Sequence, residues 1–131
     1  HVKSLEQYGR MLGIAFQISD DLLDILGTEA ETGKSLGSDF RKQKLTLPLI
    51  RLLSQAEEPD SGRIRELLSR PTESTWSELV PFLERSDAVE YTRARANEFS
   101  ASARGSLSGL PDSPAKRILE DITEFVTQRS F

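Results

Sequence analysis

The chain contains no cysteine, and its single histidine is His1. Zinc and copper sites in proteins are built mainly from cysteine and histidine ligands, so any metal site here must use oxygen ligands. Without cysteine there is no disulfide scaffold of the kind that stabilises small secreted proteins. A chain free of cysteine suits the reducing cytosol, and we predict a cytoplasmic protein.

Long apolar runs and positive charge are also scarce. The longest apolar segment is interrupted by Gln17, Ser19 and several acids, so no transmembrane segment or secretory signal is visible in these residues. A targeting segment upstream of His1 stays open. The net charge is -4 and the isoelectric point is about 5.1, which argues against a nucleic-acid-binding surface. A length of 131 residues with 37% hydrophobic residues is typical of one soluble globular domain.

The most informative stretch is a helix that we predict over residues 2–26, ended by Gly27. Its second half is apolar on more sides than one helix face can hold, so we expect it to be packed nearly all round. The apolar residues are Met11, Leu12, Ile14, Ala15, Phe16, Ile18, Leu22, Leu23, Ile25 and Leu26. The few polar residues among them are therefore the candidates for function.

Four polar side chains fall roughly on one stripe of this helix, because Gln17, Asp20, Asp21 and Asp24 are spaced by three or four residues. Burying unpaired carboxylates costs several kcal/mol each, so such acids must bind a cation or face water. Oxygen ligands point to Mg2+, Mn2+ or Ca2+, and Mg2+ fits best because it takes one or two protein carboxylates and reaches substrate phosphates. Lys34 can add positive charge near the same phosphates. The alternative interpretation is a helix that ends in a solvated acidic turn.

The rest of the chain also predicts helices. Residues 28–44 form a long polar loop of the kind that is usually functional, and proline or glycine separates the segments that follow. Thr46 with Pro48, and Ser113 or Asp112 with Pro114, are predicted helix starts. Trp76 is predicted to pack in the core. The expected buried face of the last helix consists of Ile118, Leu119, Ile122, Phe125 and Val126. No strand pattern is visible, so the predicted fold class is all-α.

Residues 13–24, 33–39 and 44–48 together resemble the second aspartate-rich motif of the trans-isoprenyl diphosphate synthases, the polyprenyl synthetase family. Residues 110–119 and 125–129 resemble the family's last helix with less force. The resemblance implies that residues 1–131 are the C-terminal portion of a single polyprenyl synthetase domain. The N-terminal portion, with the first aspartate-rich motif, is expected upstream of His1. The implied architecture is the helical bundle of the isoprenoid synthase fold around a central cavity.

The implied activity is a Mg2+-assisted prenyl transfer that condenses an allylic diphosphate with isopentenyl diphosphate into a longer polyprenyl diphosphate. The resemblance assigns the direct metal bond to Asp20 and water-mediated contacts to Asp21 and Asp24. It assigns the allylic diphosphate to Lys34 and Lys44, and the orientation of water or substrate to Gln17. The family usually has glycine before the second lysine, where this chain has Gln43.

The resemblance also implies a homodimer when the protein is complete, and an inactive chain when residues 1–131 stand alone. Two other classes of function remain open. One is a non-catalytic partner subunit of a prenyl synthase, against which the intact acids argue. The other is a terpene cyclase-like Mg2+-dependent enzyme, which the Lys-Leu-Thr-Leu-Pro sequence at residues 44–48 disfavours.

Overall fold

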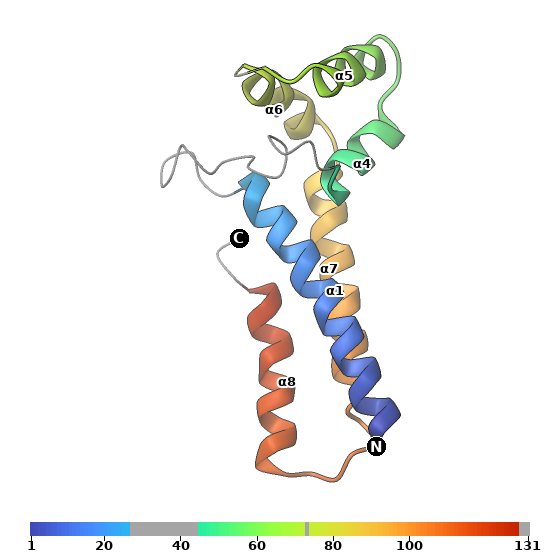
Figure 1. Cartoon of the computed structure of the whole chain (residues 1–131), viewed down its shortest axis with the longest axis vertical. Coiled ribbons are helices and arrows are strands. Elements are labelled where there is room, and N and C mark those ends of the chain that lie inside the picture. The colour runs from blue at the N-terminus through green and yellow to red at the C-terminus, as the bar shows by residue number, and fades with distance from the viewer. Residues whose placement is uncertain (27–44, 73, 129–131) are drawn as a thin grey trace. The chain divides into compact units, whose positions relative to one another are not determined.

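A computed structural model describes residues 1–26, 45–72 and 74–128 of the chain. Over these ranges it contains helices and no strand, which confirms the all-α prediction (Figure 1). The helices are α1 (Val2–Leu26), α4 (Leu47–Gln55), α5 (Asp60–Ser69), α6 (Thr75–Arg85), α7 (Ala88–Gly105) and α8 (Pro114–Thr127). The predicted loop at 28–44 lies outside the described residues. None of the helices in the described part is long and apolar enough to cross a membrane.

The chain divides into two compact units. The first unit combines His1–Asp20 with Arg93–Phe131, and the second is Asp21–Thr92. The first unit therefore holds most of α1 with most of α7 and all of α8, whereas α4, α5 and α6 belong to the second.

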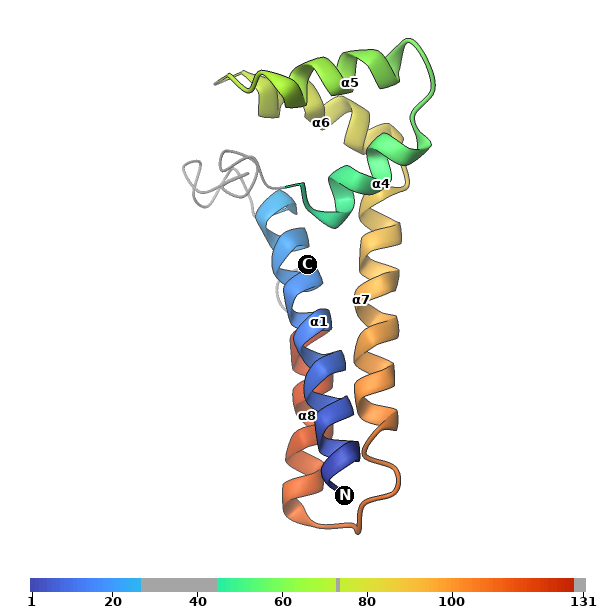
Figure 2. The same ribbon diagram turned by 45° about the vertical axis from the view of Figure 1, so that its right-hand side comes forward.

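Small and apolar residues form the core of the first unit. Tyr8 of α1 packs with Ala103 and Leu107, and Leu119 of α8 joins this cluster. The Tyr8 hydroxyl donates a 2.7 Å hydrogen bond to the main-chain carbonyl of Leu119, and partial burial raises the pKa of this phenol. Segments far apart in sequence thus lie side by side, as two views of α1 and α8 show (Figure 2).

The start of α8 follows its sequence closely. Pro114 occupies the first turn, and the Ser113 hydroxyl accepts a 3.0 Å hydrogen bond from the Lys116 amide. A serine cap satisfies an amide that has no partner inside the helix, and a proline in the first turn has no such amide to satisfy. The predicted cap is therefore confirmed for Ser113.

The predicted buried face of α8 is partly wrong. Thr123 and Val126 are buried, but Ile118, Ile122 and Phe125 are exposed. The Ser100 hydroxyl of α7 donates a 2.6 Å hydrogen bond to the Thr123 carbonyl, and this contact identifies the side of α8 that faces its own unit. The apolar face of α8 is wider than the side that packs within its own unit. Ile118, Ile122 and Phe125 therefore stay exposed.

The second unit has its own apolar core, to which five of the described helices contribute. Ile25 of α1 packs there with Ala88 of α7 and with side chains from α4, α5 and α6, namely Leu49, Leu52, Ile64, Leu67, Leu79 and Leu83. Trp76 packs against this cluster, which confirms its predicted core role. Thr46 stands at the N-cap of α4 as predicted, although its side chain makes no capping hydrogen bond.

An arginine–carboxylate pair joins α4 to the turn before α7. Arg51 donates two hydrogen bonds to the Asp87 carboxylate, of 3.0 and 2.7 Å, and its guanidinium lies 4.2 Å from the centre of the Tyr91 ring. A two-pronged contact of this kind holds both partners in a defined orientation. The hydrogen bond from Arg51 lowers the pKa of the Asp87 carboxyl below its ordinary value.

We expect Asp87→Asn to lower the stability of the complete protein at neutral pH. Because the folded-state pKa of Asp87 is lowered, its stabilisation is present above the unfolded value of about 3.9 and disappears as the pH falls through the folded value. Urea unfolding at pH 7 should therefore separate variant from wild type, and unfolding at a pH below the folded value should not. Asp112→Asn is the control, since the Asp112 side chain is 99% exposed and its ion pair with Lys116, at 3.3 Å, lies at the surface. A difference that persists unchanged in acid would contradict the ionic origin.

Candidate metal and diphosphate site

Four of the predicted site residues, Gln17, Asp20, Asp21 and Asp24, lie on the last three turns of α1. Gln17 and Asp20 are exposed, and Asp21 and Asp24 are half-buried. The helix continues without interruption to Leu26, so the predicted spacing holds in three dimensions. Residues four apart on a helix have Cβ atoms roughly 5–6 Å apart, which makes Gln17 a neighbour of Asp21 and Asp20 a neighbour of Asp24.

Burial on the opposite side of α1 explains why these polar groups remain accessible. Its buried residues recur at three and four and are Tyr8, Ala15, Ile18, Ser19, Leu22 and Ile25. The expectation that the second half of α1 is packed nearly all round is not met within the described residues, because Phe16 is 48% exposed. The acids thus lie away from the buried residues in the apolar second half of α1, with Asp20 exposed and Asp21 and Asp24 half-buried.

The three carboxylates by themselves do not converge on one point. No group of three or more Asp, Glu, His or Cys side chains within the described ranges is placed to hold a metal ion. Neighbouring positions on a helix point about 100° apart, so Asp20 and Asp21 diverge. Mg2+ needs only one or two protein carboxylates when waters and substrate phosphates supply the other ligands. The exposed carboxylate of Asp20 fits such an ion.

Lys34 and Lys44 both lie outside the described residues, so their assignment to the allylic diphosphate stays a prediction. The described chain resumes at Leu45, which is 52% exposed, and α4 begins two residues later.

Two residues near the acids were not recognised from sequence. Ser19 is fully buried, and its hydroxyl has no hydrogen-bond partner among the described residues. Buried hydroxyls normally form a hydrogen bond, so a serine on the apolar side of a helix marks a position that calls for a polar partner. This position of Ser19 was the signal that the sequence offered. The apolar pattern of α1 predicts Phe16 in the core, yet it is half-exposed beside Gln17.

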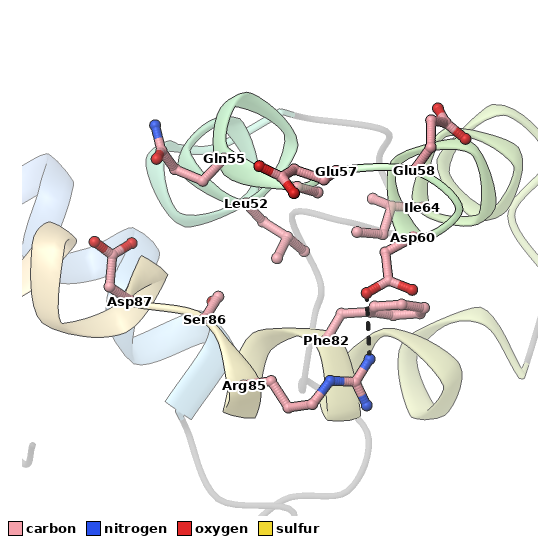
Figure 3. Close-up of a pocket in the computed structure, with 11 residues that line it drawn as sticks. Leu52, Gln55, Glu57, Glu58, Asp60, Ile64, Phe82, Arg85, Ser86 and Asp87 are labelled. Atoms are coloured by element: carbon pink, nitrogen blue, oxygen red, sulfur yellow. Dashed lines mark ion pairs between the residues drawn. The ribbon is translucent and has the colours of Figure 1, made fainter.

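A cavity of about 480 Å3 lies in the second unit and contains none of the predicted site residues (Figure 3). Its walls come from the end of α4, the start of α5 and the end of α6. Asp60 lies 3.8 Å from Arg85, as the dashed line shows, and Glu58 lies 3.7 Å from Arg65. These side chains are all more than half exposed, so the pairs are loose and solvated and contribute little.

The segment that carries the acids matches a known protein family. The profile of the Polyprenyl synthetase family matches residues 1–80, more than half of the chain. The chain belongs to the polyprenyl synthetase family. The matched segment includes α1 with Gln17, Asp20, Asp21 and Asp24. It also includes Lys34 and Lys44, the two predicted diphosphate ligands.

Individual members of the family agree along nearly the whole chain. A short chain isoprenyl diphosphate synthase of Methanothermobacter thermautotrophicus is 38% identical over 128 residues, which are 98% of this chain and 39% of that protein. The crystal structure of geranylgeranyl pyrophosphate synthetase from Pyrococcus horikoshii superposes with a TM-score of 0.86 at 34% identity. It covers 98% of this chain and 39% of that one.

A third relative was solved with ligands. The polyprenyl synthase from Caulobacter crescentus, in complex with calcium and isoprenyl diphosphate, has a TM-score of 0.84 at 29% identity. The alignment covers 97% of this chain and 39% of that structure. The 131 residues therefore span about two fifths of the length of the relatives they match.

Proposed function

We propose that the complete protein is a polyprenyl diphosphate synthase, a prenyltransferase that condenses an allylic diphosphate with isopentenyl diphosphate. The observation that carries this proposal is the exposed Asp20 on an uninterrupted α1, four residues from Asp24, inside the segment that matches the family. In this proposal residues 1–131 form the C-terminal portion of a single catalytic domain.

The chemical task is ionisation of the allylic diphosphate, which leaves an allylic cation that the double bond of isopentenyl diphosphate attacks before a proton is lost. Bound Mg2+ would neutralise the charge that develops on the departing diphosphate. Asp20 would hold the ion directly, because its carboxylate is exposed. Asp21 and Asp24 are half-buried and would orient its bound waters.

Gln17 stands one helical turn before the acids and is exposed. Its amide can both donate and accept a hydrogen bond, so it can orient a water or a substrate group without adding charge. A neutral polar group beside an allylic cation does not repel it, and it supplies no strong nucleophile to capture it.

The Caulobacter relative supports the ligand assignment, since its complex contains a hard divalent cation and an isoprenyl diphosphate. Calcium and magnesium both prefer oxygen ligands, and the acids of α1 offer such ligands. Mg2+ is the proposed physiological ion and Mn2+ an acceptable substitute. The proposed assembly is a homodimer of the complete protein.

An activity assay of the complete protein separates this proposal from its rivals. Prenyl transfer requires both an allylic diphosphate and isopentenyl diphosphate, with Mg2+, and yields a longer diphosphate. Product from the allylic diphosphate alone would identify a cyclase-like enzyme. No turnover with any allylic substrate would identify a non-catalytic subunit.

We expect Lys34→Ala to raise KM for the allylic diphosphate about tenfold or more, with a smaller change for isopentenyl diphosphate. A hydrogen bond between charged groups contributes roughly 1.5–3 kcal/mol, and tenfold in affinity corresponds to about 1.4 kcal/mol. Steady-state kinetics with each substrate varied in turn provide the measurement. Lys3→Ala is the matched control, because Lys3 is exposed in the first turn of α1, far along the helix from the acids. Equal losses for both substrates would argue against this role of Lys34.

A further inference from the structure

The last helix carries an apolar surface that no described residue of its own unit covers. Ile118, Ile122 and Phe125 are 60%, 37% and 69% exposed, and they are spaced by four and three residues. Residues with this spacing lie along one side of a helix. We call these three residues the α8 stripe.

The other side of the apolar surface of α8 already packs within its own unit. Thr123 and Val126 are buried, and Leu119 packs against the Tyr8 cluster. Two hydrogen bonds reinforce this packing, from Tyr8 to the Leu119 carbonyl and from Ser100 to the Thr123 carbonyl. The α8 stripe is therefore a second apolar side, and it adds to the one that holds α8 in place.

The remaining side of α8 is charged and faces water. Arg117, Asp121 and Glu124 are all exposed, and Glu124 lies 3.5 Å from Arg104 in a surface ion pair. A helix at the surface of a domain needs one apolar side and one polar side. With two apolar sides and one polar side, α8 has the pattern of a helix that packs between two neighbours.

We propose that the α8 stripe is the docking surface for an apolar helix that belongs to the complete protein outside residues 1–131. Three large apolar side chains in one row form a surface that folded proteins normally cover. The length of the relatives supports a cover from the same polypeptide. The Pyrococcus chain matches 98% of this chain with only 39% of its own length, so most of its folded structure lies outside the matched part. The inference rests on family membership and not on prenyl transfer.

Thiol labelling of the complete protein tests whether the α8 stripe is covered. Phe125→Cys should react with a maleimide about tenfold or more slowly than Glu124→Cys in the native state, and at the same rate after unfolding. The two positions are adjacent on α8 and both exposed within residues 1–131, so they are matched controls for each other. Any native cysteines are first replaced by serine. Equal native rates would overturn the proposal.

A photo-crosslink identifies the cover. With p-benzoylphenylalanine in place of Phe125, irradiation of the complete protein should produce a crosslink within one chain, to a peptide outside residues 1–131. A crosslink between two copies would assign the stripe to self-association, and one to a peptide within residues 1–131 would assign it to this part of the chain. Either result, or no crosslink, overturns the proposal. None of these readouts requires catalysis, so an inactive protein would count against the proposed function and leave this inference standing.

Discussion

If the complete protein is the proposed prenyltransferase, replacing Asp20 with alanine is expected to reduce its kcat by about a hundredfold to ten-thousandfold. A metal ion that neutralises a leaving group contributes several kcal/mol to transition-state stabilisation, and each 1.36 kcal/mol corresponds to a factor of about ten in rate. Asp20 is the proposed direct ligand because its carboxylate is exposed on α1. Asp24→Ala should reduce kcat less, because Asp24 is proposed to contact the ion through water and its loss leaves the direct ligand Asp20 in place.

The fold should survive the change at Asp20. Alanine is the strongest helix former, and the removed side chain points away from the buried side of α1. Steady-state kinetics at saturating Mg2+ measure the effect, and thermal unfolding checks the fold. Glu6→Ala is the control, because Glu6 is an exposed acid on the same helix, outside residues 13–24 that resemble the aspartate-rich motif. Wild-type turnover of Asp20→Ala would remove the site assignment.

The isolated 131-residue chain is expected to have no prenyltransferase activity and to self-associate. Beyond the α8 stripe, α1 exposes Val2, Leu5 and Phe16, of which Val2 is 74% exposed. A monomer typically carries an apolar patch of about 300–600 Å2, and a larger patch favours association. In the isolated chain, the acids of α1 would also have no further ligands with which to complete a metal cluster. They would face no closed cavity that keeps water away from the allylic cation.

Sedimentation combined with a turnover assay tests this expectation. If the bare apolar residues drive association, a chain with Ile118→Ser and Phe125→Ser should shift toward the monomer and remain inactive. A monodisperse, active monomer of the unchanged chain would contradict both the fragment interpretation and the mechanism built on it.

Local patterns in the sequence were sufficient for most of the helices. The bounds of α1, the proline positions at the starts of α4 and α8, and the Ser113 cap all follow from periodicity and from the chemistry of helix ends. The spacing of Gln17, Asp20, Asp21 and Asp24 needed only the knowledge that this segment is a helix. The resemblance to the polyprenyl synthetases rested on the same local stretch, and the family match confirmed it.

Contacts between distant segments decided the rest. Periodicity shows that Ile118, Leu119, Ile122, Phe125 and Val126 share one apolar arc, but only the packing of α7 and α1 on α8 shows which half is covered. The pairing of Arg51 with Asp87, 36 residues apart, has no local signal. The sequence alone determined which residues lie on each side of a helix. The tertiary structure decided which of those sides is buried, because burial depends on neighbours that are distant in the chain.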